Sequence, residues 1–393
     1  MTPLGCQRAL FALPETDTWL NSAYMGPLPR PVLEAGHAAL DLKAFPARIT
    51  PADFFVPAER TRERCAALVG ANPERVAFVT NVAAGTAIVA RNLEPRPGSN
   101  VVVLDRLFPS NLFAWRGWRR EGVTVRTVTP PPADAADPRA WRARCEAWSR
   151  AVVDAIDGDT LLAAVEQAHW TDGTLFDLDA IAARCRVTGA ALVVDATQTA
   201  GAMPIDAGAL RADLLVVHAY KSMLSNYGLG FAVLGDRFAD GRPHEESWLV
   251  RRGAEDFSRL VDYQDDYAAG MRRYDTSLRA NPVLIRMLEA ASGLLLEWRP
   301  ERIREYLLGI SRDAVARLRA AGFGVADEDL RAANVFGVHL PGGLAAEGCR
   351  AELARRRVHV SVRGDAVRVS PHVYNDAQDL ARLADALIEV GGR

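Results

Sequence analysis

Six short apolar runs alternate with longer helical patterns along much of the chain. They span residues 75–79, 101–104, 160–165, 191–194, 214–217 and 231–234. Because each run is apolar at successive positions, both of its faces are expected to be buried, as in a mostly parallel sheet covered by helices. The sequence therefore predicts an α/β fold, in which ligands bind beyond the carboxyl ends of the strands.

The size and composition of the chain predict a large buried core divided between two lobes. The chain has 393 residues, of which 49% are hydrophobic and 24% are charged. A long helical pattern over residues 283–298 leads into an α+β tail, which we expect to form the second, smaller lobe.

Charge, cysteine spacing and hydropathy exclude several functions. A formal net charge of −2 gives no global basic field, so we expect no nucleic-acid partner. The five cysteines are scattered and lack CxxC spacing, so neither a disulfide framework nor a metal site is expected. No run of eighteen uninterrupted apolar residues occurs, so we expect no membrane span and a cytoplasmic enzyme.

Two polar residues follow apolar runs where a ligand would bind. Asp195 ends the run 190–195, and Lys221 follows the run 212–220. An amine held away from water has a lowered pKa, which suits it to form a Schiff base with an aldehyde, although a lysine after a strand can also point into solvent. A carboxylate can keep a pyridine nitrogen protonated. The spacing of the pair therefore indicates pyridoxal 5'-phosphate.

Three motifs within residues 165–235 resemble the class V aminotransferase family of enzymes that depend on pyridoxal phosphate. They are Glu-Gln-Ala-His-Trp-Thr-Asp-Gly at 166–173, Asp-Ala-Thr-Gln at 195–198 and His-Ala-Tyr-Lys at 218–221. Similarity continues from Asn21 to Asn375 and covers nearly the whole chain. The family includes cysteine desulfurases, kynureninases and isopenicillin N epimerase-like enzymes.

The resemblance implies the type I fold of pyridoxal-phosphate-dependent transferases. A large αβα domain would span residues 43–279, and a small α+β domain would combine residues 1–42 and 280–393. The working unit would be a homodimer with shared active sites. An amino-acid substrate is implied as the small-molecule partner.

The resemblance also assigns candidate cofactor contacts. The backbone of Ala83 and Ala84 would hold the phosphate at the start of a helix, where free N–H groups and the helix dipole favour an anion. Phe108 would stack on the pyridine ring, and Gln198 would donate to the phenolic oxygen. The complete expected set is Ala83, Ala84, Thr86, Phe108, His169, Asp195, Gln198, His218, Tyr220, Lys221 and Thr276.

Four members of this set have weaker assignments. His169 stands where the family commonly has an asparagine with a task like that of Gln198. Tyr220 would bond the phosphate with help from His218, and Thr276 would reach the phosphate of the partner subunit. Taken alone, His169, His218, Tyr220 and also Phe108 would be interpreted as packing residues.

Arg368 is the expected anchor for the substrate. It lies between apolar neighbours on a predicted strand, where an unpaired guanidinium is costly to bury, so it needs an anion. The matching arginine of the family holds the substrate α-carboxylate. A structural ion pair with Asp365 is the alternative, and Arg363 is open to either interpretation. Asn21 and Tyr24 complete the expected substrate contacts.

The reaction type remains open between several outcomes. Lys221 would remove the Cα proton of the substrate, and the fate of the resulting carbanion then decides the product. We rank aminotransferase-type chemistry first, then a kynureninase-like reaction or C–S β-lyase, then amino-acid epimerisation. Phe108 in place of the histidine of desulfurases, and the absence of cysteine from residues 358–365, argue against a desulfurase. A non-catalytic binding protein on this fold is the alternative of another class.

Overall fold

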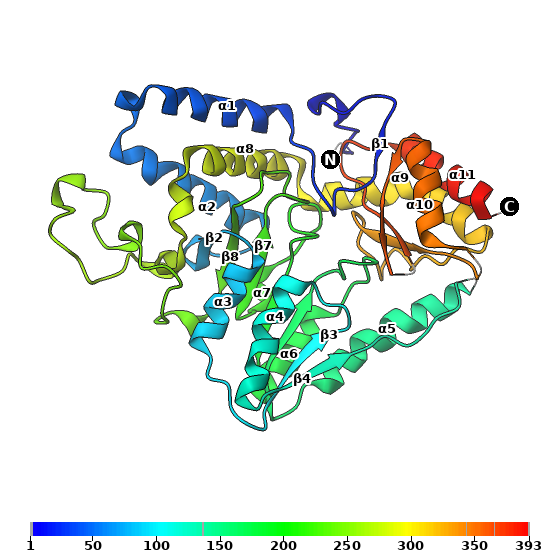
Figure 1. The fold of residues 1–393 in the computed structure, drawn as a ribbon, viewed down its shortest axis with the longest axis horizontal. Coiled ribbons are helices and arrows are strands. Elements are labelled where there is room, and N and C mark those ends of the chain that lie inside the picture. The colour runs from blue at the N-terminus through cyan, green and yellow to red at the C-terminus, as the bar shows by residue number, and fades with distance from the viewer. Residues whose placement is uncertain (1–2, 136, 343, 365, 392–393) are drawn as a thin grey trace.

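A seven-stranded sheet forms the centre of the computed structural model, which describes residues 3–135, 137–342, 344–364 and 366–391 (Figure 1). The strand order is β2-β8-β7-β6-β5-β3-β4. All neighbouring pairs are parallel except those of β8, which runs antiparallel to β2 and β7. The strands are β2 (Val76–Val79), β3 (Asn100–Leu104), β4 (Thr124–Val128), β5 (Thr160–Glu166), β6 (Ala191–Asp195), β7 (Leu214–His218) and β8 (Gly230–Leu234).

Both faces of this sheet are covered by helices, as the unbroken apolar runs predicted. Successive residues of β2 divide between two cores, because side chains alternate across a strand. Ala77 and Val79 belong to one core, with residues of the helices α3, α5 and α6. Val76 and Phe78 belong to the other, with residues of α2, α8 and α9. The architecture is therefore the αβα sandwich that was expected.

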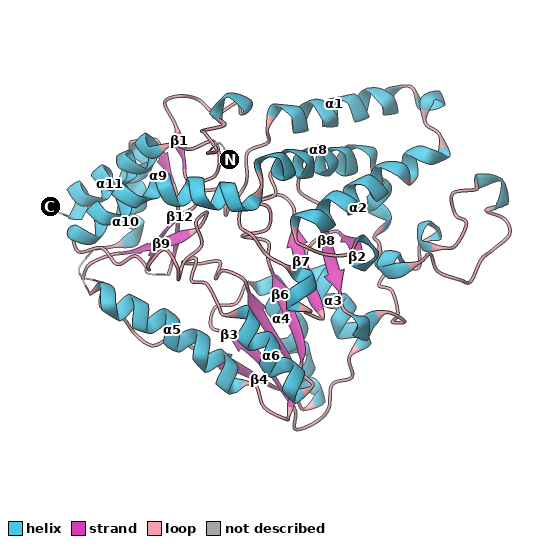
Figure 2. Cartoon of the chain, turned by 180° about the vertical axis from the view of Figure 1, so that it is seen from behind, coloured by secondary structure: helices cyan, strands magenta, loops and turns pink. Residues whose placement is uncertain are grey.

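The helices fall into the layers shown in Figures 1 and 2. On the large lobe they are α2 (Val56–Leu68), α3 (Val82–Asn92), α4 (Pro109–Gly117), α5 (Pro138–Ala155), α6 (Leu178–Thr188) and α7 (Ala207–Leu210). The helix α1 (Arg30–Ala44) packs on α8 (Pro282–Trp298), which in turn packs on α2. Among the described residues, no helix is both long enough and apolar enough to cross a membrane.

The C-terminal part forms a smaller α+β lobe, as the tail predicted. Its sheet has the order β11-β12-β9, with all pairs antiparallel. The strands are β9 (Phe336–His339), β11 (Ser361–Arg363) and β12 (Ala366–Val369), and the helices are α9 (Pro300–Ala320), α10 (Ala346–Arg355) and α11 (Ala377–Gly391).

The N-terminal arm joins this smaller lobe. Its strand β1 (Thr18–Trp19) pairs in parallel with β10 (Val358–His359), and Leu20 is buried in the core of the lobe. The arm therefore runs beside β12 and reaches the carboxyl edge of the central sheet. The domain boundaries at residues 43 and 279 remain a prediction.

A long segment leaves the body of the protein between β8 and α8. Residues 240–269 extend to one side, in yellow-green at the left of Figure 1. Two large side chains near its tip are almost fully exposed, since Val261 is 79% and Tyr263 92% accessible.

Candidate active site

Polar and aromatic side chains converge in one cavity at the carboxyl edge of the central sheet. Glu166 ends β5, Asp195 ends β6 and Lys221 follows β7, so the strand order brings their side chains together. The cavity has a volume of about 180 Å³. It is lined by Asn81, Val82, Ala83, Phe108, Ser110, Glu166, Trp170, Asp195, Thr197, Gln198, His218, Tyr220, Lys221 and Tyr227. Seven of the eleven expected cofactor contacts are thus found together.

Lys221 is the only lysine in the cavity, and the sequence contains one other, Lys43. Lys221 is 5% exposed, whereas Lys43 is exposed at the end of α1. Burial lowers the pKa of Lys221 to about 8, and the charge of Arg368 acts in the same direction. Its Nζ atom lies 4.9 Å from the centre of the Phe108 ring. The cavity therefore holds an amine that loses its proton more readily than an ordinary lysine.

Asp195 is buried beside Lys221. Its Oδ1 atom accepts a hydrogen bond of 2.9 Å from the N–H of Thr197. Burial raises the pKa of Asp195, and the hydrogen bonds of Thr197 oppose this effect. A cationic group in the cavity would relieve the cost of burying this carboxylate.

Glu166 is a second carboxyl group in the cavity, and the sequence interpretation missed its role. It is 2% exposed, and its Oε2 atom accepts a hydrogen bond of 2.9 Å from the N–H of Trp170. Burial, together with the adjacent Asp195, holds the pKa of Glu166 well above its usual range. Its place at the end of an apolar run, equivalent to that of Asp195, was the signal that could have identified it.

The start of α3 forms another wall of the cavity. Asn81 caps the helix by accepting the N–H of Ala84 at 2.9 Å, so that donor is already used. The hydroxyl of Thr86 is buried and donates to the carbonyl of Ala83 at 3.1 Å. Ala84 and Thr86 therefore do not line the cavity, whereas Val82 and Ala83 present first-turn N–H groups, which lack partners within the helix.

Three aromatic rings stand together near this helix start. The rings of His218, Tyr220 and Tyr227 lie pairwise 4.5 to 4.7 Å apart, measured between their centres. Burial lowers the pKa of His218 to about 4, so this imidazole is neutral at physiological pH. His218 and Tyr220 were expected here, and Tyr227 was not.

The structure places His169 outside the lining of the cavity, and its expected contact with the cofactor remains a prediction. One ring nitrogen lies 2.9 Å from the carbonyl oxygen of Asp105, and the other lies 2.6 Å from the hydroxyl of Thr171. The ring also packs on Trp148, with centres 4.9 Å apart. The next residue, Trp170, faces the cavity instead.

Thr276 also lies outside this cavity. Its hydroxyl donates to Glu245 at 2.8 Å, and its N–H donates to the carbonyl of Phe78. Its expected contact with the phosphate of a partner subunit remains a prediction.

Arg368 lies behind Trp170, with hydrogen-bonding capacity left over. It is 1% exposed, and its Nη1 donates to the carbonyl of Trp170 at 2.9 Å. Its Nε and Nη2 atoms are buried without a hydrogen-bond partner among the described residues. Burial lowers the pKa of Arg368 to about 9, and the charge of Arg363 adds to this effect. The alternative partner Asp365 lies outside the described residues.

Asn21 and Tyr24 connect the N-terminal arm to this region. The side-chain carbonyl of Asn21 accepts a hydrogen bond of 2.8 Å from the Ser361 hydroxyl, so Asn21 supports β11 and does not line the cavity. Tyr24 is 55% exposed. Burial lowers the pKa of Arg363, and the phenol of Tyr24 opposes this effect. Tyr24 therefore stands near Arg363 at the surface.

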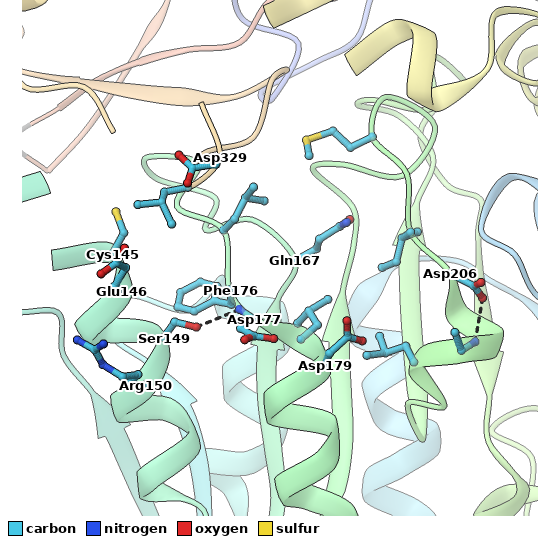
Figure 3. A pocket seen from close by; sticks show the side chains of 17 residues that line it. Cys145, Glu146, Ser149, Arg150, Gln167, Phe176, Asp177, Asp179, Asp206 and Asp329 are labelled. Atoms are coloured by element: carbon cyan, nitrogen blue, oxygen red, sulfur yellow. Dashed lines mark hydrogen bonds between the residues drawn. The ribbon is translucent and has the colours of Figure 1, made fainter. Parts of the chain in front are cut away.

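A larger pocket of about 660 Å³ lies between α5, α6 and α7, and Figure 3 shows it from close by. Its lining includes the ring of Phe176. Two of its polar side chains, those of Asp206 and Ser149, accept hydrogen bonds from nearby backbone N–H groups. Asp206 caps α7 by accepting the N–H of Ala209, and Ser149 accepts the N–H of Asp177. None of the cavity residues named above lines this pocket, so its groups do not add to the site at Lys221.

Comparisons with known proteins agree with this site. The family model described as "Aminotransferase class-V" matches residues 50–383. An uncharacterized aminotransferase, YcbU of Bacillus subtilis, is 28% identical, with 97% of this chain and 96% of the relative covered. The isopenicillin N epimerase of Amycolatopsis lactamdurans is 27% identical, with coverage of 98% and 97%.

Solved structures share the fold at low sequence identity. The cysteine desulfurase CsdA of Escherichia coli gives a TM-score of 0.78 at 18% identity, with 98% of this chain and 97% of the other covered. A complex of the cystine C–S lyase C-DES gives 0.80 at 21% identity, with coverage of 94% and 98%. The fold is thus the type I fold expected from the sequence. The chain belongs to the class V aminotransferase family of pyridoxal-phosphate-dependent enzymes.

Proposed function

We propose that the cavity around Lys221 binds pyridoxal phosphate and acts at the Cα atom of an amino acid, with aminotransferase-type chemistry as the leading reaction. The observation that carries this proposal is the buried Lys221 amine with its lowered pKa, beside Asp195 and 4.9 Å from the Phe108 ring centre. An amine, a carboxylate and an aromatic face are the three groups that a pyridine aldehyde needs.

Unsatisfied polar atoms support the fit of this cofactor. Gln198 lines the cavity, and its Nε2 makes only a long hydrogen bond of 3.5 Å to the carbonyl of Ala23, so this donor can turn to the phenolic oxygen of a bound cofactor. The first-turn N–H groups of Val82 and Ala83 suit a phosphate at the positive end of the α3 dipole. The cavity thus offers polar contacts at both ends of a flat ring.

Each residue has a defined task in the proposed reaction. Bound pyridoxal phosphate supplies an electron sink for the carbanion formed at Cα. Asp195 holds the proton on the pyridine nitrogen, and Lys221 moves the proton at Cα. Arg368 orients the substrate through its α-carboxylate, because its free Nε and Nη2 atoms form a planar fork. Trp170 and Phe108 exclude water from one side, since their rings meet edge to face at 5.4 Å.

The position of Cys349 favours aminotransferase or lyase chemistry over desulfuration. A desulfurase needs a mobile thiol that takes up sulfur. Cys349 is 1% exposed on α10, and burial raises the pKa of its thiol. A kynureninase-like reaction or C–S β-lyase, and then an epimerase, remain the alternatives, while a non-catalytic binding protein gives no reason for the buried amine.

The test is a panel of amino acids added to the loaded full-length protein without oxygen. Cofactor absorbance reports binding, and mass spectrometry identifies the product. A keto acid indicates transamination, an inverted amino acid indicates epimerisation, and loss of a side-chain group indicates a lyase. If no cofactor is taken up, the proposal is refuted.

We propose in addition a homodimer in the cytoplasm, with domains divided at residues 43 and 279. The extended segment 240–269, with Val261 and Tyr263 exposed, supports a contact with a second copy of the chain. All five cysteines are free thiols, which agrees with a reducing compartment. Light scattering coupled to gel filtration tests the dimer, and a Tyr263→Glu variant should weaken it.

A further inference from the structure

Two arginines share the ring of Trp170, which lines the cavity, although neither arginine lines it itself. Arg363 ends β11 and Arg368 lies on β12, the neighbouring antiparallel strand. The Cζ atom of Arg363 lies 5.4 Å from the centre of the Trp170 ring, and that of Arg368 lies 5.9 Å away. The Trp170 ring is held by a hydrogen bond of 2.7 Å from its Nε1 to the carbonyl of Arg106, and the backbone N–H of Trp170 donates to Glu166. A tightly held aromatic ring thus carries two guanidinium groups.

Neither arginine is neutralised by the part of the chain that the structure describes. No carboxylate of the described residues lies within 4.0 Å of either guanidinium. Arg363 donates from Nη1 to the carbonyl of Val362, and its Nε is buried without a partner among these residues. The charge of Arg363 lowers the pKa of both Arg368 and Lys221. The site therefore has more positive charge than one α-carboxylate compensates.

Arg363 lines a neighbouring cavity that contains charges of both signs: Arg144 there is paired with Asp172, and Arg106 lies near Asp105. The guanidinium of Arg106 lies next to Gly364, directly after Arg363 in the chain. Arg106 is only weakly compensated, since its Nε is 3.9 Å from the carboxylate of Asp105. The carboxyl groups of Glu166 and Asp195 are at the buried end of the cavity. An anion beside the Trp170 ring would be close to Arg363, which stands near the phenol of Tyr24.

We propose that Arg363 binds a second acidic group on the substrate, so that the substrate class is amino acids whose side chain ends in a carboxylate. This inference rests on the proposed function, in which Arg368 holds the α-carboxylate. One planar carboxylate satisfies one guanidinium fork. Arg363, with a buried unsatisfied donor and an uncompensated charge, gains most from a second carboxylate.

The experiment uses simple acids, which bind whatever the reaction is. Succinate, glutarate and adipate are titrated by calorimetry against butyrate, pentanoate and hexanoate, on the loaded full chain and on the chain without added cofactor. The parent is compared with Arg363→Gln, Arg368→Gln and the control Arg312→Gln, which removes an exposed arginine of α9.

We expect at least one diacid to bind at least about tenfold tighter than its monoacid of equal length, the scale of a hydrogen bond to a charged group. Arg363→Gln should remove this preference for the diacid. It should leave the dissociation constant of the monoacid within about twofold of the parent value. Arg368→Gln should weaken both acids, and Arg312→Gln neither. Equal binding of diacid and monoacid by the parent would overturn the inference.

Another result would also overturn it. If Arg363→Gln weakens monoacids and diacids in the same proportion, both arginines hold a single carboxylate. Failure to take up pyridoxal phosphate refutes the proposed function instead. The titration without cofactor then still reports on the arginine pair, so the two failures are distinguishable.

Discussion

Glu166 and Asp195 are register partners at the ends of β5 and β6, so two carboxyl groups lie side by side at the buried end of the sheet. Burial and the charge of Asp195 hold the pKa of Glu166 well above its usual range. Two neighbouring carboxyl groups cannot both be ionised at low cost in such a place. Burial raises the pKa of both groups, and more strongly that of Glu166, so Asp195 is the member of the pair that gives up its proton more readily.

The first prediction concerns Glu166→Gln. In the unfolded chain Glu166 has the ordinary pKa of 4.5, and in the folded protein its pKa is raised. Between these two pKa values, unfolding releases the proton of Glu166, so the free energy of unfolding of the parent falls as pH rises. The amide removes this dependence. We therefore measure the free energy of unfolding of variant and parent by urea titration without cofactor. The difference, variant minus parent, should increase between pH 4.5 and pH 7.

A matched control is Glu34→Gln, which replaces an exposed glutamate on α1. It should leave the pH dependence of the parent unchanged. A difference for Glu166→Gln that stays constant with pH would mean that this carboxyl group is ionised in the folded protein.

The second prediction compares two helix caps. Asn81→Ala removes the cap of α3 at the cavity, and Asn281→Ala removes the cap of α8 away from it. Each change should cost about 1 kcal/mol of stability. Only Asn81→Ala should also weaken the binding of pyridoxal phosphate, measured by fluorescence titration. Equal cofactor affinity in both variants would contradict a phosphate site at the start of α3.

The third prediction concerns Asp195→Asn. A neutral partner does not hold the proton on the pyridine nitrogen, so activity should fall by several orders of magnitude. Folding should survive, as checked by circular dichroism. Near-normal turnover in this variant would show that another group stabilises the carbanion.

The fourth prediction concerns Arg368→Lys. Lysine keeps the positive charge but loses the planar fork, so substrate binding should weaken by about 1.5–3 kcal/mol. The absorbance of the bound cofactor should be unchanged, because in our proposal Arg368 holds the substrate and not the cofactor. An unchanged dissociation constant for the substrate, or loss of the cofactor, would contradict this role. Either result would mean that Arg368 stabilises the fold and does not bind the substrate.

The central sheet could be predicted because its strands are apolar on both faces. The carboxyl-edge position of Asp195 and Lys221 followed from the same runs. Hydropathy alone does not give the antiparallel direction of β8, since Phe231–Leu234 is as apolar as its parallel neighbours. The short connection from β7, which has no room for a crossover helix, was the signal that could have predicted it.

The expected contacts and the lining of the cavity differ where a local hydrogen bond decides the orientation of a group. Ala84 stands at the right place in the sequence, but the Asn81 side chain occupies its N–H. His169 is turned away by the Asp105 carbonyl, a contact between residues 64 positions apart. Sequence position defines the loop, and only the folded contacts define which side chain faces the cavity.

The most direct test of the account uses the scarcity of lysine in this chain. The only lysines are Lys43, exposed on α1, and Lys221, buried in the cavity. The loaded protein is reduced with borohydride, digested and mapped by mass spectrometry, with Lys221→Ala and Lys43→Ala as a matched pair. We expect one pyridoxyl-labelled peptide, containing residue 221, in the parent and in Lys43→Ala, and none in Lys221→Ala. A label on Lys43, or an unlabelled Lys221 in the loaded parent, would contradict the assignment of the active site.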